Sequence, residues 1–535
     1  MGIPSYFSHL IRQYGDILCK YANIIQQNIV FDRLYMDCNS ILYDSYRKID
    51  VHETYENMER LLLEKTGDAI EQYIRQIKPS QYIYIAFDGV APLAKMEQQR
   101  NRRYKSWFET CMMQKMDPTK EVPDVKKTTC IFTPGTPFMN KLCVYMKKRF
   151  LNQERKYRVK KIIVATPDEP GEGEHKLFAH MREVKSGEHE TSVVYGLDAD
   201  LLMLSLFHLK YVSRIFVFRE SPQFGALKKG NHDPEEPLFL DMAKLARGIA
   251  ANMNCKNTDS HRMCDYIFMC FLLGNDFLPH FPALNIRTGG INILLDTYRI
   301  TIGNVQERFL VSRDMEIQWK EVYRFISVLA KNEYHYICQE YATRRKWDEK
   351  PVELQPKKTL KEKTDLFLNT PMLYRKEEKY ICPQESGWEG RYYEVLFSED
   401  VKIQDICVNY LEGLQWVFDY YTKGLVNWVW KYKYSYAPLL KDLAPKVPIH
   451  KIQFHKSNTK PVSPQTQLAY VLPPIYHFLL EPSLAKKLRT QYKDDYVGLP
   501  CVNGLPNLEF KWAFCRYFWE AHVSLGEPRF PHTPS

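Results

Sequence analysis

We predict an α/β fold in which a mostly parallel sheet is covered by helices on both faces. Two patterns in roughly the first 300 of the 535 residues lead to this prediction: short apolar or alternating runs typical of strands, and longer stretches with the apolar spacing of helices. The two kinds of segment alternate along the chain. Because neighbouring parallel strands need a crossover between them, this alternation favours a parallel sheet with helices on either side.

The prediction rests on five strands and on the helices between them. Strands are expected at Arg33 to Asp37, Gln81 to Phe87, Lys161 to Ala165, Ser192 to Leu197 and Ser213 to Phe218. Helices are expected at Tyr55 to Ile77, Thr136 to Leu151 and Glu174 to Glu183. A further apolar helix from Asp265 to Leu273 leads directly into the Gly274-Asn275-Asp276 turn.

A charged stretch divides the chain. Residues from Trp347 to Thr364 lack periodicity and include Pro351 and Pro356, as linkers or surface loops do. We therefore expect a core at residues 1–346, a charged linker or loop at 347–366, and a second region at 367–535. The second region is expected to be largely helical and is rich in Tyr and Trp from Tyr410 to Pro438.

Composition limits the functional classes. The net charge is +10, and an acidic cluster within a basic surface is typical of proteins that hold and hydrolyse a phosphate backbone. A mildly basic protein without a polyanion partner is the alternative. Thirteen scattered cysteines without a Cys-x-x-Cys pair argue against a disulfide framework and indicate an intracellular, reducing compartment. No apolar run approaches ~20 residues, so no membrane span is expected.

Seven carboxylates follow apolar, strand-like runs or lie in tight turns within the first 276 residues. A single Asp there is more often a turn former or helix cap, but repetition at successive elements argues against that interpretation. Acids that follow parallel strands gather at one rim of the sheet and repel one another unless cations lie between them. Hard divalent ions fit such a site, and paired ions serve phosphodiester chemistry. The seven are Asp37, Asp88, Glu172, Glu174, Asp198, Asp200 and Asp276.

A basic segment follows Asp88. On a helix, Lys95, Gln99 and Arg102 lie along one face, and Arg103 is adjacent. Converging Lys, Gln and Arg side chains make a pocket for a terminal phosphate, in which Arg supplies a planar fork of donors. The alternative is a solvated basic helix face.

Several short segments occur in a fixed order along the chain. They include Met1-Gly2-Ile3-Pro4, Leu34 to Asn39, Phe87 to Pro92, Lys95-x3-Gln99-x2-Arg102-Arg103, Thr133 to Met139, Pro170 to Lys176, Tyr195 to Leu201 and Gly274 to Pro282. Later come Gly387-Trp388, Arg391 to Glu394, Glu412 to Trp416 and Tyr434-x-Tyr436-Ala437-Pro438. From residue 1 to about residue 480, this set resembles the Xrn-type 5′→3′ exoribonucleases.

The resemblance implies a nuclease core of the PIN/flap-nuclease kind. It implies that the seven acids bind two divalent ions, Mg²⁺ or Mn²⁺, and that Lys95, Gln99, Arg102 and Arg103 hold a 5′-monophosphate. The implied activity is processive 5′→3′ hydrolysis of single-stranded RNA with a 5′-monophosphate, which releases mononucleotides. The protein is expected to act as a monomer without a membrane partner.

The chain departs from the family pattern at three places. Six residues after its first Asp the family usually has a His that stacks on the terminal base, whereas this chain has Tyr43, which also offers a π face. Trp428 and Trp430 occupy the family's Trp-x-Trp segment; one of them is expected as the opposing stacking partner, and burial in the core is the alternative. We expect the chain to lack the extra C-terminal domains of the large cytoplasmic members and the zinc knuckle of some nuclear ones. We expect a cytoplasmic rather than a nuclear location.

Two rival functions use the same residues. A structure-specific DNA flap nuclease needs the same acids, but the basic pocket after Asp88 and the second block of motifs suit an enzyme that captures ends. A non-catalytic RNA-binding scaffold is disfavoured because none of the seven acids is missing.

Overall fold

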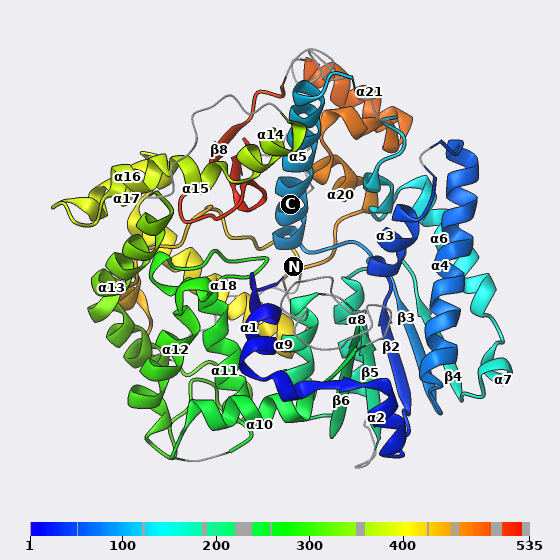
Figure 1. Ribbon diagram of the computed structural model, residues 1–535, viewed down its shortest axis with the longest axis horizontal. Helices are drawn as coiled ribbons and strands as arrows, with labels where there is room; N and C mark the ends of the chain where they lie inside the picture. The colour runs from blue at the N-terminus through cyan, green and yellow to red at the C-terminus, as the bar shows by residue number, and fades with distance from the viewer. Residues whose placement is uncertain are drawn as a thin grey trace.

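The computed structural model describes residues 2–50, 52–119, 124–184, 190–196, 198–219, 238–256, 259–348, 359–424, 427–450, 454, 459–493 and 505–526. Within them, seven strands form one sheet in the order β1-β7-β6-β5-β2-β3-β4 (Figure 1). The strands are β1 (Leu18–Lys20), β2 (Arg33–Asp37), β3 (Tyr82–Ala86), β4 (Lys161–Ala165), β5 (Thr191–Tyr195), β6 (Arg214–Arg219) and β7 (Leu238–Asp241).

Five neighbouring strands, from β6 to β4 in the sheet order, are parallel, and β7 is antiparallel to both β6 and β1. The predicted fold class is therefore confirmed, and the five predicted strands match within two residues at each described end; Leu197, the expected end of one strand, lies outside the described residues. The edge strands β1 and β7 were not predicted. At three and four residues they are too short to show a period in the sequence.

The central strands are buried on both faces. In β2, Leu34 and Met36 belong to one hydrophobic cluster and Tyr35 belongs to the other. Successive side chains of a strand point to opposite faces, so a strand covered on both sides needs a continuous apolar run. This run is what places Asp37 at the end of β2, where the strand leaves the core.

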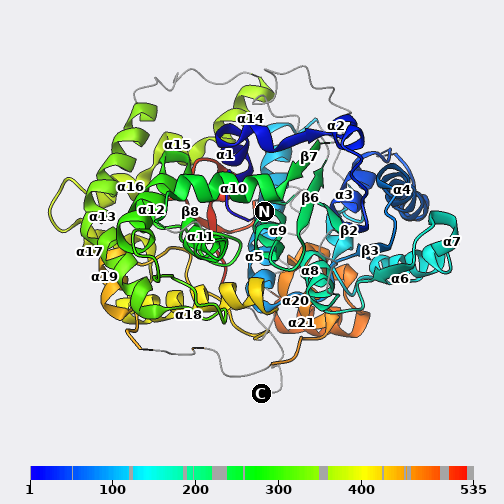
Figure 2. The same cartoon turned by 90° about the horizontal axis from the view of Figure 1, so that it is seen from below.

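Helices cover both faces of the sheet, and Figure 2 shows the strands between them. One face is covered by α3 (Asn39–Arg47), α4 (Tyr55–Ile77), α6 (Pro137–Phe150) and α20 (Pro464–Val471). The other is covered by α8 (Gly173–Glu183), α9 (Ala199–His208), α10 (Met242–Met253), α11 (Arg262–Cys270) and α18 (Ile403–Thr422). Helix α18 belongs to the aromatic-rich second region, so that region and the sheet share one core.

The shorter elements complete the chain. They are α1 (Tyr6–Gln13), α2 (Tyr21–Gln26), α7 (Glu154–Tyr157), α12 (Gly290–Tyr298), α15 (Thr370–Tyr374), α17 (Trp388–Leu396), α19 (Leu440–Leu443), α21 (Pro482–Gln491), β8 (Glu509–Lys511) and β9 (His522–Ser524). None of the helices described here is long and apolar enough to cross a membrane.

Helices occupy both ends of the range expected as a charged linker or loop, 347–366. Helix α13 (Trp319–Asp348) continues into it, and α14 (Leu360–Leu368) begins within it; residues 349–358 lie outside the described residues. Helix α14 starts with a capping box, in which the Thr359 hydroxyl and the Glu362 carboxylate each accept a backbone N–H. Its charged first turns hide the helical pattern, since only the last turn places a large side chain, Phe367, in a hydrophobic cluster.

Helix α5 (Leu93–Met116) begins at the rim of the sheet and runs away from it (Figure 1). Residues 505–526 pack along this helix. Lys105 Nζ donates to the carbonyl oxygens of Trp519 and Ala521 at 2.7 and 2.9 Å, and Arg100 donates to that of Gly526 at 2.9 Å. The C-terminal segment thereby fixes the position of the basic helix.

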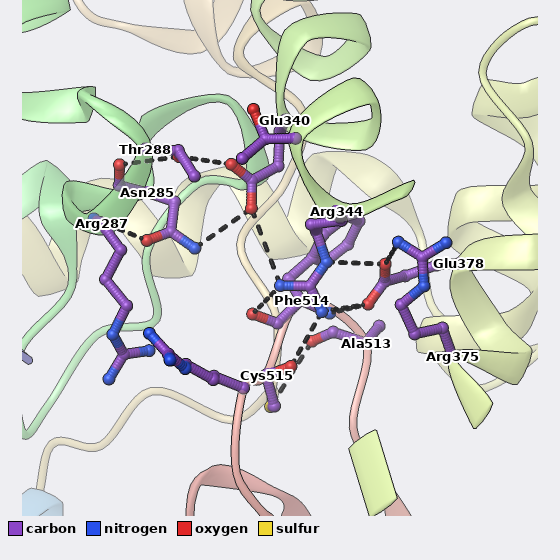
Figure 3. A network of polar contacts seen from close by, with 12 residues as sticks. Asn285, Arg287, Thr288, Glu340, Arg344, Arg375, Glu378, Ala513, Phe514 and Cys515 are labelled. Carbon is purple, nitrogen blue, oxygen red and sulfur yellow. Dashed lines mark hydrogen bonds and ion pairs between the residues drawn. The ribbon is translucent and has the colours of Figure 1, made fainter. Parts of the chain in front are cut away.

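A buried ion pair holds the C-terminal segment against the helical region (Figure 3). Arg344 of α13 donates twice to Glu378 of α16 (Lys376–Ile381), at 2.8 and 2.6 Å, and each side chain is 1% exposed. Arg344 also donates to the Cys515 carbonyl at 2.8 Å, while Glu378 accepts the backbone N–H of Phe514 at 2.9 Å. Both charged groups therefore also bond to the backbone of the C-terminal segment, at Phe514 and Cys515. The pair thus connects α13, α16 and residues 505–526.

Candidate active site

The seven predicted acids follow elements that end at one rim of the sheet. Asp37 ends β2, Asp88 lies two residues after β3, Glu172 and Glu174 open α8 after β4, and Asp198 and Asp200 open α9 after β5. These four strands are neighbours in the sheet, so their carboxyl ends bring the acids together. Asp276 joins them from the turn that follows α11.

Gly173 allows the two glutamates to approach the acids of the strands. Its backbone N–H donates to Asp88 at 2.7 Å. A Cβ atom at this position would lie 2.9 Å from an Asp37 carboxylate oxygen and 3.4 Å from one of Asp88. Asp37, Asp88 and the start of α8 therefore border one small space that a larger residue would fill.

Gly2 lies close to two further acids, Asp200 and Asp276, as Gly173 lies close to Asp37 and Asp88. Its backbone N–H donates to Asp276 at 3.1 Å, and a Cβ atom there would lie 2.4 Å from an Asp200 carboxylate oxygen. Its φ of 58° also favours glycine. The N-terminal motif of the sequence thus contributes to the site through its backbone, whereas the Asp198 side chain is exposed at the edge of the cluster.

Lys95, which the sequence assigned to the phosphate pocket, lies among the acids. Its Nζ is 2.6 Å from Glu172 Oε2 and 2.8 Å from Asp276 Oδ2. Burial alone would raise the pKa of Asp276, but the Lys95 ammonium holds that pKa well below its usual range. Burial likewise opposes the charge of Lys95, and the carboxylates of Asp276 and Glu172 raise its pKa well above the usual value.

Four of the acids, Asp37, Glu172, Glu174 and Asp200, have raised pKa values because they are buried beside other carboxylates. Burial, followed by the charges of Asp88 and Asp198, raises the pKa of Asp37 well above its usual value. Burial and the neighbouring Asp200 do the same to Glu174. For Asp200, burial and Asp276 raise the pKa to about 6. This excess of buried negative charge favours the binding of cations.

The donor set fits hard divalent ions. Carboxylate oxygens are the ligands that Mg²⁺ and Mn²⁺ prefer. Among the described residues, ligand atoms of Glu172, Glu174 and His175 all lie within 4.8 Å of one another. His175 Nδ1 is buried and has no hydrogen-bond partner in the part of the chain that is described, and burial lowers the pKa of this His well below its usual value.

Two tyrosines of α18 contact the acids and were not expected. The Tyr420 hydroxyl donates to Glu172 at 2.7 Å, and the Tyr421 hydroxyl donates to Asp200 at 2.7 Å. The ring of Tyr420 also stacks on His175, with 3.5 Å between ring centroids. The sequence marked this region as aromatic, but no pattern in it indicates which rings face the sheet.

The rest of the basic segment lies on the next turns of α5. Gln99 is buried, and its Oε1 lies 3.5 Å from Gln467 Nε2 of α20. Arg102 is exposed, whereas Arg103 has a buried Nη1 with no hydrogen-bond partner among the described residues. Burial lowers the pKa of Arg103, and the Tyr43 hydroxyl is among the groups close enough to oppose this. An anion could satisfy that buried guanidinium nitrogen.

The three predicted stacking residues differ in their surroundings. Tyr43 is half-buried and packs edge-on against Phe132, with 5.0 Å between ring centroids. Trp428 is half-buried, and its carbonyl accepts the N–H of Leu93 at the start of α5 at 2.8 Å. Trp430 is 8% exposed and stacks on Trp416, as a core residue does, and its contact with a base stays a prediction.

Comparison with known proteins agrees with this geometry. The family model described as "XRN 5′-3′ exonuclease N-terminus" matches residues 1–221, and the model described as "Xrn1 helical domain" matches residues 257–383 and 374–488. The chain belongs to the Xrn exonuclease family. All seven acids and the basic helix lie within the matched ranges.

Curated Xrn relatives are similar to most of this chain. It is 26% identical to "5′-3′ exoribonuclease 2 homolog" of Drosophila melanogaster, over 88% of this chain and 64% of that relative. It is 26% identical to "5′-3′ exoribonuclease 1" of Saccharomyces cerevisiae, over 90% of this chain and 40% of the relative. It is 28% identical to "5′-3′ exoribonuclease 1" of Homo sapiens, over 88% of this chain and 30% of that relative. The chain thus spans less than two thirds of the length of these Xrn proteins.

Proposed function

We propose that this protein is a 5′→3′ exoribonuclease that degrades single-stranded RNA with a 5′-monophosphate and releases mononucleotides processively. The main observation is that one rim of the sheet joins an acidic cluster to a basic helix through Lys95, which contacts Glu172 and Asp276. A cluster that binds cations therefore lies beside groups suited to a terminal phosphate. The names of the relatives, all 5′-3′ exoribonucleases, support the same activity.

The acids are proposed to hold two divalent ions, Mg²⁺ or Mn²⁺, which when bound would activate a water and stabilise the leaving 3′ oxygen. Asp37 and Asp88 lie beside Gly173, Asp200 and Asp276 lie beside Gly2, and Lys95 joins Glu172 to Asp276. Asp198 lies at the exposed edge. The raised pKa values of the buried acids support the need for compensating charge.

Lys95 is proposed to neutralise the acids and to contact the phosphate of the substrate. Its ammonium lies within hydrogen-bond distance of Glu172 and Asp276, and its place on the first turn of α5 puts it on the same helix as the basic residues that follow. Gln99, Arg102 and Arg103 would then bind the 5′-monophosphate. The buried Nη1 of Arg103 supports this role, because no described residue accepts its hydrogen bonds and a phosphate oxygen would do so.

Aromatic contacts are proposed to hold the RNA without reading its sequence. Tyr43 lies near Arg103 and would stack on the terminal base, and Trp428, next to the start of α5, would act as the opposing partner. The substrate end would thus be held by charge at its phosphate and by stacking at its base. A single copy of the chain carries all of these groups, consistent with the proposed monomer.

The test compares substrate ends. RNA labelled at its 3′ end and carrying a 5′-monophosphate, 5′-triphosphate or 5′-hydroxyl is incubated with Mg²⁺, with a flapped DNA duplex as the rival substrate. We expect mononucleotides from the monophosphorylated RNA, little product from the other RNAs, and loss of product with Glu174→Gln or with a chelator. Preferential cleavage of the DNA flap would favour the flap nuclease, and RNA binding without hydrolysis would favour the non-catalytic scaffold.

A further inference from the structure

We propose that Tyr420 and Tyr421 are positioning residues that hold Glu172 and Asp200 in the orientation required for divalent ions. The inference rests on the proposed function in one respect, namely that these acids bind metal. It goes beyond that function because it assigns the completion of the metal site to the second region of the chain.

Tyr420 and Tyr421 are consecutive residues on the last turn of α18. Consecutive helical side chains point about 100° apart, so they normally serve different surroundings. Here both hydroxyls donate to carboxylates at 2.7 Å, Tyr420 to the start of α8 and Tyr421 to the start of α9. The end of α18 therefore contacts both acid-bearing helices at once.

Each hydroxyl occupies one oxygen of its carboxylate and leaves the other one for a cation. Tyr420 donates to Glu172 Oε1, while Oε2 of the same group faces Lys95 at 2.6 Å. Tyr421 donates to Asp200 Oδ1, the oxygen that also lies against Gly2. A hydrogen bond to an ionised acceptor fixes the rotation of the carboxylate, as outer groups around metal ligands generally do.

The two rings are themselves held rigidly. Tyr420 stacks on His175 with an interplanar angle of 16° and contacts Phe277 and Trp416 with centroid distances of 5.7 and 5.0 Å. Tyr421 packs edge-on against Phe271 at 5.2 Å. Since each ring has little freedom to turn, its hydroxyl is directed at its acid before any ion binds.

The burial of a tyrosine does not by itself explain why its hydroxyl donates to a carboxylate. A buried tyrosine hydroxyl needs one acceptor, and a backbone carbonyl is sufficient. Tyr392 of α17 is an example in this protein, since it is buried and donates to the Ala437 carbonyl at 2.7 Å. Removing that hydroxyl should affect packing without affecting metal, which makes Tyr392→Phe a matched control.

The experiment measures Mn²⁺ binding without RNA, by calorimetry and by electron paramagnetic resonance, in the full chain and in Tyr420→Phe, Tyr421→Phe and Tyr392→Phe. We expect each of the first two variants to weaken the binding of at least one ion by about tenfold or more. Tyr392→Phe should bind as the wild type does. The Mg²⁺ concentration that gives half-maximal rate should rise in the same two variants, with recovery of turnover at saturating metal.

Two outcomes would overturn the inference, and they can be told apart. Unchanged ion affinity in Tyr420→Phe and Tyr421→Phe, with normal binding in the wild type, would overturn the positioning role alone. Absence of Mn²⁺ binding in the wild type would overturn both this role and the metal-dependent part of the proposed function. Thermal unfolding and circular dichroism identify any variant that is misfolded, and the two tyrosines provide independent tests.

Discussion

Lys95 and Asp276 are 181 positions apart in the chain, and their charged groups lie 2.8 Å from each other. The same ammonium contacts Glu172. One lysine therefore joins two acids from different elements. This relationship makes Lys95 a counter-charge for both acids.

Lys95→Met should destabilise the protein strongly only when metal is absent. Breaking a buried ion pair costs about 3–5 kcal/mol because the remaining charge is uncompensated, and bound Mg²⁺ would replace the missing charge. Thermal unfolding with chelator and with Mg²⁺ measures this difference. The control is Lys431→Met, since Lys431 pairs with Glu97 at 3.1 Å outside the cluster. If Lys95→Met lost the same thermal stability with chelator as with Mg²⁺, the prediction would be contradicted.

Asp200→Asn should stabilise the metal-free protein at neutral pH. The folded pKa of Asp200 is raised to about 6, so the folded state binds a proton more tightly than the unfolded state does. Stability from this group is present below the unfolded pKa near 4 and is lost as the pH rises through about 6. Asparagine does not ionise, so the variant does not lose this stability as the pH rises. Its thermal unfolding midpoint should exceed that of the wild type by about 1–3 °C at pH 7.5.

The same comparison at pH 4 should give nearly equal midpoints, because both side chains are then neutral. With Mg²⁺ at pH 7.5 the order should reverse, because only the wild type retains the ligand. If the variant were equally stable or less stable than the wild type in chelator at every pH, the acids would not repel one another as the buried geometry implies.

Arg102→Ala and Arg103→Lys should each reduce the preference for a 5′-monophosphate. Charge-assisted hydrogen bonds contribute about 1.5–3 kcal/mol, so the ratio of rates on monophosphate and hydroxyl ends should fall at least about tenfold. A lysine cannot reproduce the planar fork of Arg103. Lys115→Ala, at an exposed position near the end of the same helix, is the control. A wild-type protein that treats both ends equally would refute the pocket.

Tyr43→Ala should weaken single-stranded RNA binding by roughly 1–3 kcal/mol, whereas Tyr43→Phe should have little effect because the π face is kept. Affinity for 5′-phosphorylated RNA in the presence of a chelator measures binding without hydrolysis. Tyr46 also packs edge-on against Phe132 and serves as a control for lost packing. If Tyr46→Ala were as damaging as Tyr43→Ala, the support of Phe132 and not stacking would explain the effect.

Glu378→Gln should destabilise the fold by about 3–5 kcal/mol, because it leaves Arg344 buried without its counter-charge. Chemical unfolding measures the loss, and proteolysis should become faster within residues 505–526, which the pair holds in place. The exposed pair of Glu389 and Lys441, at 2.7 Å, supplies the control, and Glu389→Gln should cost less than about 1 kcal/mol. Equal effects of the two substitutions would contradict the ordering role of the buried pair.

The sheet could be predicted because each central strand is buried on both faces and carries a run of apolar residues. Asp37 stands out where such a run ends, and the other acids repeat the pattern. Tyr420 and Lys95 could not be placed in this way. A buried tyrosine in an apolar helix carries no local signal of its partner, and no local signal separates Lys95 from Gln99, Arg102 and Arg103 of the same basic segment. The roles of all site residues, the domain boundaries and the cellular location stay predictions.

The hydroxyls of Tyr420 and Tyr421 also bear on how the proposed metal site is completed as the chain folds. Tyr420 and Tyr421 follow their acids by 248 and 221 positions. During synthesis the N-terminal part emerges first, so all seven acids can be in place while α18 is not yet made. A nascent chain of that length has the proposed ligands without the two tyrosines that contact them. On the proposed function, a potentially destructive site would be completed only after the second region has folded.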